Sequence, residues 1–372
     1  MNKILASFYA FLGIFASLLL AACAQKIITE NKSSDEMLAK KELKRLNISQ
    51  NGRGVKFFGD SHVASGAMVA AFRDEYFKDA ASVGSVGFVP AAVSKYHAHS
   101  ELSFENNGFE ILNSRRDKYD DYALCGVVAK ADENATMSLK LKKLKGLFGV
   151  EILHKFSQSG EIFTLKDANA KEYKITQKSP DIWEYSTFAL SFPLEIKALK
   201  SGAELGGYKI YQKGDFVDFC AANGAYSSIS AKWSDEAWSR DFAGFDYELF
   251  ILAYGTNDAL DKDFSESGFY NSMKSLITKL KSTSKNAKLV LVTPPPSPKI
   301  KKMPLVISAL KRLARDENAI FVDTMAFVES SGGWKGWRKN KLVSRDNLHL
   351  SHDGYKKIGA FIAKSVKNEM KN

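Results

Sequence analysis

The chain has 372 residues, of which 45% are hydrophobic and 26% are charged, and its formal net charge is +11. This composition excludes a disordered chain, and the length suits two domains. The positive charge fits either an anionic partner or a lysine-rich solvated surface. The sequence has no basic patch interleaved with aromatic residues, so nucleic acid is not an expected partner.

The first segment has the features of an export signal. A basic start precedes an apolar run over residues 4–20, and Cys23 directly follows Leu-Ala-Ala. The run is short for a membrane span, and small residues before a cysteine resemble a bacterial lipobox. We therefore expect a signal peptide over residues 1–22 and lipidation of Cys23, which implies a periplasmic, membrane-anchored lipoprotein. The alternatives are a plain secretory signal and an uncleaved anchor in which Cys23 has no special role.

Residues 23–50 are mostly polar and charged, as expected of a tether between a membrane and a domain. Two cysteines remain in the rest of the chain, Cys125 and Cys220. In an exported protein they could form a disulfide, or they could be two small buried residues, because sequence does not give their separation in space.

Strands and helices alternate at both ends of the remaining chain. An apolar run over residues 55–58 ends at Gly59, and a helical pattern follows over residues 62–77. Later apolar runs predict strands, and amphipathic segments between them predict helices: strands at 216–220, 247–254, 289–292 and 319–322, and helices at 269–280, 305–314 and 354–366. This order predicts an α/β domain with a parallel sheet covered on both faces.

The pattern changes over residues 127–212, where short segments with period-two alternation and turn residues follow one another. Such segments predict a β-sandwich. It interrupts the α/β domain, which is therefore made of residues 51–126 and 213–372.

Three short motifs follow predicted strands or precede the last helix. Ser61, in Gly-Asp-Ser, lies where a strand turns into a helix, so it is either a nucleophile at the carboxyl edge of the sheet or part of a helix cap. Asn257, in Gly-Thr-Asn-Asp, either donates to an oxyanion or forms an Asx turn. Asp346 and His349 have the spacing of an orienting carboxylate and a general base. His97 and His99 form a metal-like pair without a third ligand, so no metal is expected.

Taken in order, Gly59-Asp60-Ser61, a glycine after the second strand, Gly255-x-Asn257-Asp258 and Asp346-x-x-His349 resemble the four blocks of the SGNH (GDS-type) hydrolases. The runs at 59–65, 83–90 and 223–225 look like Gram-negative peptidoglycan O-acetylesterases, which carry a carbohydrate-binding-like β-module inserted in the hydrolase domain. Leu350 departs from the proline or aromatic residue that many relatives have there.

This resemblance implies a flavodoxin-like three-layer hydrolase domain without a cofactor. It implies Ser61 as the nucleophile, His349 as the base and Asp346 as its orienting partner. The oxyanion hole would comprise the N–H groups of Ser61 and Gly224 and the Asn257 amide, although Gly207 and Gly214 compete with Gly224.

The implied reaction is removal of O-acetyl groups from peptidoglycan sugars through an acetyl-Ser61 intermediate. Acetyl transfer onto a sugar by the same triad, and an inert glycan-binding envelope lipoprotein, are the alternatives.

Two groups of aromatic residues each have two interpretations. The aromatic residues of the insert, which either stack on glycan or fill a core, are Trp183, Tyr185, Tyr208 and Tyr211. Those near the last motif, which either line the cleft or pack a loop, are Trp334 and Trp337.

Overall fold

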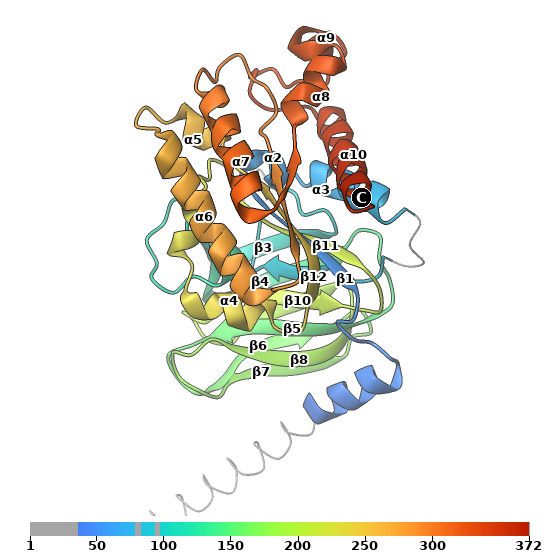
Figure 1. Ribbon diagram of the computed structural model, residues 1–372. Coiled ribbons are helices and arrows are strands. Elements are labelled where there is room, and N and C mark those ends of the chain that lie inside the picture. The colour runs from blue at the N-terminus through green and yellow to red at the C-terminus, as the bar shows by residue number, and fades with distance from the viewer. Residues whose placement is uncertain (1–35, 79–82, 94–96, 372) are drawn as a thin grey trace, which may run out of the picture.

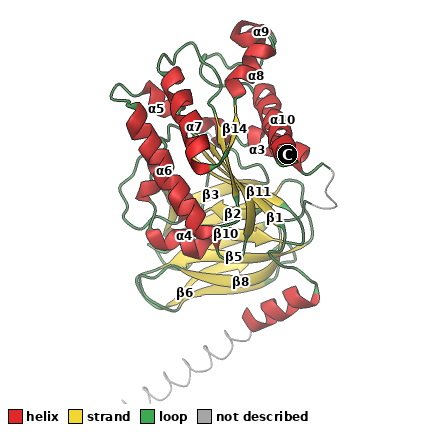
Figure 2. Ribbon diagram, in the orientation of Figure 1, coloured by secondary structure: helices red, strands yellow, loops and turns green. Residues whose placement is uncertain are grey.

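The computed structural model describes residues 36–78, 83–93 and 97–371 (Figure 1). Helices gather around a parallel sheet in one part of the molecule, and a second part consists almost entirely of strands (Figure 2). The two parts are in contact, and the chain passes from the first to the second and back again.

The parallel sheet has five strands in the order β11 (Phe216–Ala221), β1 (Arg53–Gly59), β12 (Asp246–Ala253), β13 (Lys288–Val292) and β14 (Ile320–Val322). Numbered along the chain within this sheet, the order is 2-1-3-4-5, the flavodoxin-like arrangement expected from the resemblance. The earliest strand therefore lies between strands that come much later in the chain.

Successive side chains of these strands face opposite layers of helices. On β1, Phe58 belongs to the core beneath α4 (Asp235–Phe242), α6 (Glu266–Thr283) and α7 (Met303–Glu317). Its neighbour Phe57 belongs to the core beneath α3 (Ala67–Tyr76) and α10 (His352–Glu369). This alternation confirms the predicted parallel sheet covered on both faces. Shorter helices complete this part: α2 (Ser61–Ala64), α5 (Thr256–Leu260), α8 (Thr324–Ser330), α9 (Gly333–Lys339) and the 3₁₀ turns η1 (Leu124–Gly126) and η2 (Ile229–Lys232).

The second sheet is antiparallel and has nine strands. Its main path runs β7 (Glu172–Gln177), β6 (Gly160–Lys166), β9 (Leu194–Ala198), β4 (Val127–Leu141), β10 (Glu204–Tyr211), β5 (Leu147–Lys155) and β8 (Glu184–Ser191). Tyr173 of β7 donates from its hydroxyl to the carbonyl of Ala189 in β8 at 3.3 Å, so the two ends of the path meet. The sheet therefore curls into a nearly closed barrel around one apolar core.

This sheet starts earlier in the chain than the insert predicted over residues 127–212. Strand β2 (Gly87–Pro90) pairs with β10, and β3 (Leu102–Asn113) pairs with β4. The middle of β3, residues 103–108, is largely exposed, so it lacks the apolar alternation that marks a half-buried strand. The predicted boundary was wrong because this strand buries little beyond its ends.

A buried ion pair joins the two parts. Lys56 of β1 and Asp218 of β11 are fully buried, and Lys56 Nζ lies 3.0 Å from the Asp218 carboxylate. The second oxygen of Asp218 accepts from the backbone N–H of Phe88 in β2 at 2.7 Å and from the hydroxyl of Tyr247 at 2.7 Å. The carboxylate therefore links the antiparallel sheet directly to β11 and β1, the first two strands of the parallel sheet.

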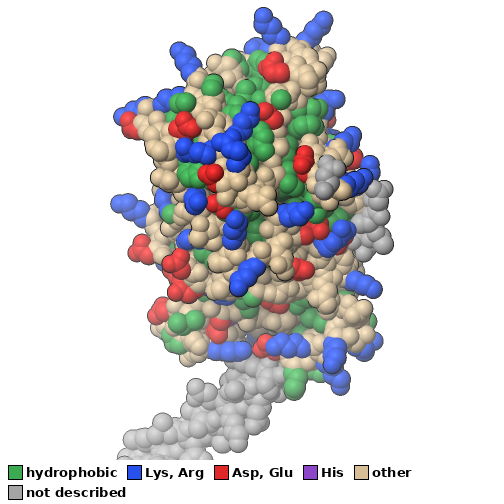
Figure 3. All heavy atoms as spheres, in the orientation of Figure 1, with side chains coloured by type: hydrophobic (Ala, Val, Ile, Leu, Met, Phe, Trp, Pro, Cys, Tyr) green, Lys and Arg blue, Asp and Glu red, His purple; other side chains and the backbone are tan. Residues whose placement is uncertain are grey.

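The predicted signal peptide and Cys23 lie outside the described residues. Within the segment predicted as a tether, residues 36–45 form a helix, and Ala39 and Leu43, one turn apart, are buried. Among the helices that the structure describes, none has both the length and the apolarity to cross a membrane. Lysine and arginine side chains are spread over the visible face with acidic side chains between them (Figure 3), which favours the interpretation of the charge as a solvated surface.

Candidate active site

Ser61 is the first residue of α2, directly after β1. Asp60 caps this helix, since its carboxylate accepts from the backbone N–H of His62 at 3.0 Å. Gly59 permits the turn because a Cβ there would lie 2.3 Å from Val63 and 2.9 Å from the Ala253 carbonyl. The cap is thus supplied by Asp60, and the Ser61 hydroxyl is left for another partner.

That partner is His349, 288 residues later in the chain. Ser61 Oγ and His349 Nε2 are 2.8 Å apart, and His349 Nδ1 is 2.6 Å from Asp346 Oδ2. The other carboxylate oxygen, Asp346 Oδ1, accepts from the backbone N–H groups of Leu348 and His349 at 2.9 and 3.0 Å. Burial raises the pKa of Asp346, but these hydrogen bonds outweigh it and lower the pKa to about 2. The structure therefore brings together the three residues predicted from distant motifs.

Gly224 and Asn257 lie beside Ser61 at the same edge of the sheet. Gly224 follows β11 in a left-handed conformation, with φ of 73°. Asn257, in α5, donates from Nδ2 to the Ala225 carbonyl at 3.0 Å. Both line a pocket of about 490 Å³, whose other walls are formed by Ser61 and Ser65 at α2, by Asn223 after β11, and by residues of the closing loop and helix: Leu348, His349 and Tyr355. The competing Gly207 lies within β10 and Gly214 precedes β11, so neither is at this edge.

A contact between Asp258 and Ser227 supports the site, and only the first of these residues belongs to a recognisable sequence motif. Asp258 accepts from both the backbone N–H and the hydroxyl of Ser227, at 3.1 and 2.7 Å to the same oxygen. This contact holds the turn after β11 against α5. The aspartate of the Gly-Thr-Asn-Asp motif was visible in the sequence, but its partner Ser227 was not.

His62 forms a buried layer behind the catalytic histidine candidate. Its Nδ1 is 3.0 Å from the hydroxyl of Tyr355 in α10, and its ring centroid lies 5.4 Å from that of His349. Burial lowers the pKa of His62 to about 3, with a contribution from His349. The ring is therefore neutral near pH 7, and it supports the His349 ring without placing a second positive charge beside it.

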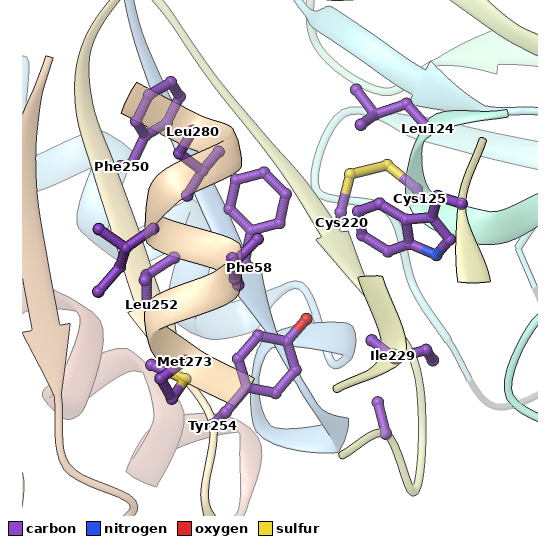
Figure 4. Close-up of a cluster of buried hydrophobic side chains, with 14 of the residues drawn as sticks. Phe58, Leu124, Cys125, Cys220, Ile229, Phe250, Leu252, Tyr254, Met273 and Leu280 are labelled. Atoms are coloured by element: carbon purple, nitrogen blue, oxygen red, sulfur yellow. A yellow bond between two sulfur atoms is a disulfide. The ribbon is translucent and has the colours of Figure 1, made fainter. Parts of the chain in front are cut away.

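Cys125 and Cys220 form a disulfide, which settles the choice that the sequence left open. Cys220 lies near the end of β11, and Cys125 lies in η1, directly before β4. The bridge packs among buried side chains that include Leu124 and Ile229 (Figure 4). It ties the antiparallel sheet to the strand that leads to Gly224.

The aromatic residues of the insert belong to the core. Trp183, Tyr208 and Tyr211 are buried, and the Trp183 indole donates to the Asp121 carbonyl at 3.1 Å. Tyr185 donates to Asp241 at 2.9 Å. Near the last motif, Trp337 is buried and donates to Ser331 at 2.9 Å, while Trp334 packs against the same cluster. Neither group lines the pocket at Ser61, so the packing interpretation holds for both.

His97 and His99 do not form part of a metal site in the structure. His99 Nδ1 accepts from the backbone N–H groups of Glu101 and Leu102, and His97 Nε2 accepts from that of Asn223. Among the residues described, no group of three or more histidine, cysteine or acidic side chains is arranged to hold a metal ion.

Comparison with protein families gives two matches that follow one another along the chain. Residues 84–195 match the family described as "Peptidoglycan O-acetylesterase, N-terminal". Residues 204–357 match the "GDSL-like Lipase/Acylhydrolase family". No curated protein matches the chain.

A solved structure shares the fold of this chain, and two others match it with low TM-scores. A structure described as "Peptidoglycan O-acetylesterase in action" has a TM-score of 0.75 and 20% identity, covering 89% of this chain and 95% of the other. A family two carbohydrate esterase from Clostridium thermocellum in complex with cellohexaose has a TM-score of 0.34 and 11% identity, covering 72% and 99% of the two chains. One from Cellvibrio japonicus has a TM-score of 0.32 and 8% identity, covering 73% and 99%.

The flavodoxin-like parallel sheet and the second family match show that this part of the chain is similar to the GDSL-type (SGNH) hydrolases, a class of carboxylic ester hydrolases. Within that class, the match over residues 84–195 shows a similarity to the peptidoglycan O-acetylesterases, and a solved structure of that description shares the fold over most of both chains.

Proposed function

We propose that this protein is a serine esterase that removes O-acetyl groups from peptidoglycan, with Ser61, His349 and Asp346 as its catalytic triad. One observation carries the assignment of the triad. The hydroxyl, imidazole and carboxylate form an unbroken chain of hydrogen bonds of 2.8 and 2.6 Å at the mouth of a pocket. The family match over residues 84–195 supports the substrate.

The reaction follows from the direction of these hydrogen bonds. His349 Nδ1–H donates to Asp346, which leaves Nε2 unprotonated and able to accept the proton of the Ser61 hydroxyl. Ser61 Oγ then attacks the acetyl carbonyl, and the bond to the sugar oxygen breaks as His349 returns the proton to that oxygen. Water, deprotonated by His349, hydrolyses acetyl-Ser61 and releases acetate.

Negative charge develops on the carbonyl oxygen during both steps. The N–H of Ser61, at the start of α2, the N–H of Gly224 and the amide of Asn257 surround the pocket from three segments of the chain. We assign the oxyanion hole to these donors, each of which contributes about 3 kcal/mol to barrier lowering in comparable enzymes. The Ala225 carbonyl holds the Asn257 amide in place.

The test is acetate release from purified O-acetylated peptidoglycan by the wild type and by Ser61→Ala. We expect kcat to fall about 10⁶-fold in the variant, because the nucleophile is absent. Ser239→Ala is the matched control, since Ser239 is exposed on α4 and bonds only to the Glu236 carbonyl. Unchanged acetate release by Ser61→Ala with an intact circular dichroism spectrum would refute the triad.

The proposal includes the localisation of the protein. The export signal over residues 1–22, lipidation of Cys23 and the tether over residues 23–50 would hold the enzyme at a membrane of the periplasm, beside its substrate. Metabolic labelling with a fatty-acid analogue, compared between wild type and Cys23→Ala, tests the anchor.

We also propose that the insert, as a carbohydrate-binding-like β-sandwich module, contacts the glycan strand. Because its tryptophan and three tyrosines are engaged in packing, such contact would use other surface residues. Retention of the Ser61→Ala protein on insoluble peptidoglycan tests this role, because this variant binds its substrate without turning it over.

A further inference from the structure

The turn that carries the Gly224 N–H is held from the outside by two loops of the antiparallel sheet. We call residues 222–227 the oxyanion turn. The backbone N–H of Asn223 donates to His97 Nε2 at 3.0 Å, and the Gly224 carbonyl accepts from Arg115 Nε at 2.5 Å. His97 lies between β2 and β3, and Arg115 follows β3, so both contacts come from the same region of the second sheet.

The loop that carries His97 also contacts the nucleophile segment. The backbone N–H of Ala98 donates to the Ala64 carbonyl, at the end of α2, at 3.2 Å. The ring of His99 stacks on that of Phe219 in β11, with centroids 5.0 Å apart. Residues 97–99 therefore lie between the segment that presents Ser61 and the strand that leads into the oxyanion turn.

Arg115 is held where it can reach the turn. Its backbone N–H donates to the Asn113 side chain at 2.9 Å, and its guanidinium lies 5.9 Å from the ring centroid of Tyr226. A Cβ on Gly224 would lie only 3.1 Å from Arg115 Nε. The guanidinium therefore packs directly against the backbone of Gly224, on the outer side of the turn.

The two hydrogen bonds act on neighbouring peptide planes. The Gly224 N–H belongs to the peptide between Asn223 and Gly224. The peptide before it is fixed through the Asn223 N–H, and the peptide after it is fixed through the Gly224 carbonyl. Because both flanking planes are fixed, the plane between them has little freedom to rotate, and its N–H keeps one direction.

His97 has the protonation state that this contact needs. Its pKa is lowered to about 4, chiefly by burial; the Asn223 contact opposes this shift, and nearby Arg116 adds to it. The imidazole is therefore neutral near pH 7 and can accept at Nε2.

We propose that His97 and Arg115 are positioning residues that aim the Gly224 N–H at the oxyanion, so that the antiparallel sheet takes part in the chemical step. The inference rests on the proposed esterase function. It predicts that loss of either contact lowers kcat, because the oxyanion donor is disordered, and leaves KM nearly unchanged, because neither side chain lines the pocket.

The experiment measures kcat and KM with 4-nitrophenyl acetate, a neutral substrate that offers Arg115 no anionic group to bind. We expect about a tenfold loss of kcat for His97→Ala and for Arg115→Ala, and about 10² for the double variant, which corresponds to losing one oxyanion donor. His97→Gln and Arg115→Lys, which keep an acceptor and a donor, should recover part of the loss. Lys118→Ala is the control, because Lys118 is an exposed cation three residues after Arg115.

Unchanged kcat in both alanine variants would overturn the proposal. The proposal would also be overturned if the variants were impaired only with O-acetylated peptidoglycan, and only through a higher KM, because Arg115 would then be a substrate contact. If His97→Ala does not fold, Arg115→Ala decides alone, since the Arg115 side chain is exposed. Failure of the proposed function is a different result: the wild type would then release no 4-nitrophenol, or Ser61→Ala would release as much.

Discussion

Asp346→Asn tests whether the 2.6 Å contact between Asp346 and His349 sets the direction of proton transfer. Asparagine has the same shape, but only one of its two terminal atoms can accept. If its oxygen keeps the two backbone N–H groups of Leu348 and His349, its amide faces His349 Nδ1. If it turns over, the two backbone N–H groups lose their acceptor and face the N–H₂ group of the asparagine instead. The first orientation is therefore preferred.

In that orientation the amide donates to Nδ1, so the imidazole must carry its proton on Nε2. Nε2–H cannot accept the proton of Ser61, and the base is lost while the geometry is kept. We expect kcat to fall about 10⁴-fold, as for the equivalent change in a serine protease, which is about 5 kcal/mol in the activation barrier. The assay is initial rate with 4-nitrophenyl acetate, with Arg345→Gln, an exposed neighbouring position, as control.

The wild-type pH profile provides a second check. The pKa of Asp346 is lowered to about 2, so its carboxylate is charged throughout the range above pH 4 and loses its charge only as the pH falls toward 2. Protonation of Asp346 therefore does not inactivate the enzyme above pH 4. Asp346→Asn with kcat within tenfold of wild type would refute this account of the triad.

Three further predictions follow from the site and its supports. Asn257→Ala removes one oxyanion donor, so kcat should fall about 10²–10³-fold with KM nearly unchanged; a change in KM alone would contradict its role. Asp60→Asn keeps the cap oxygen and removes a buried charge whose pKa is raised to about 7, chiefly by burial. Below the unfolded pKa near 3.8, Asp60 is uncharged in both states and the charge costs no stability, whereas above pH 7 the buried charge is fully destabilising. Asp60→Asn should therefore raise the free energy of unfolding in urea at pH 8 and change it little at pH 4. Equal effects at the two pH values would refute this account of Asp60. Cys125→Ala with Cys220→Ala opens a link of 95 residues and should lower the free energy of unfolding by about 4–5 kcal/mol, measured by urea; a loss below about 1 kcal/mol would contradict this.

The parallel sheet and the residues at its edge could be predicted because each lies in a local pattern. Ser61 and Asn257 follow apolar strands, and Asp346 and His349 precede the last amphipathic helix. Since carboxyl ends of parallel strands share one edge, patterns far apart in sequence predict neighbours in space. The family resemblance then gave roles to residues that were individually ambiguous.

What could not be predicted depends on contacts between loops. His97 and Arg115 reach the oxyanion turn from segments without periodicity, and nothing local indicates their partners. The disulfide was undecided because its two cysteines approach only when β11 packs beside η1. The extent of the second sheet was missed because the exposed middle of β3 carries no apolar alternation.

The position of β1 inside the parallel sheet, between β11 and β12, has a consequence for how the chain folds. Lys56 of β1 and its partner Asp218 of β11 are 162 residues apart, and Ser61 and His349 are 288 residues apart. Contacts of such long range close large loops before they stabilise anything, so they slow folding. Strand β1 cannot pair with β11 or β12 until the chain has passed through the whole antiparallel sheet, and Ser61 cannot meet His349 until nearly the entire chain has folded. Esterase activity should therefore be among the last properties that a refolding molecule regains.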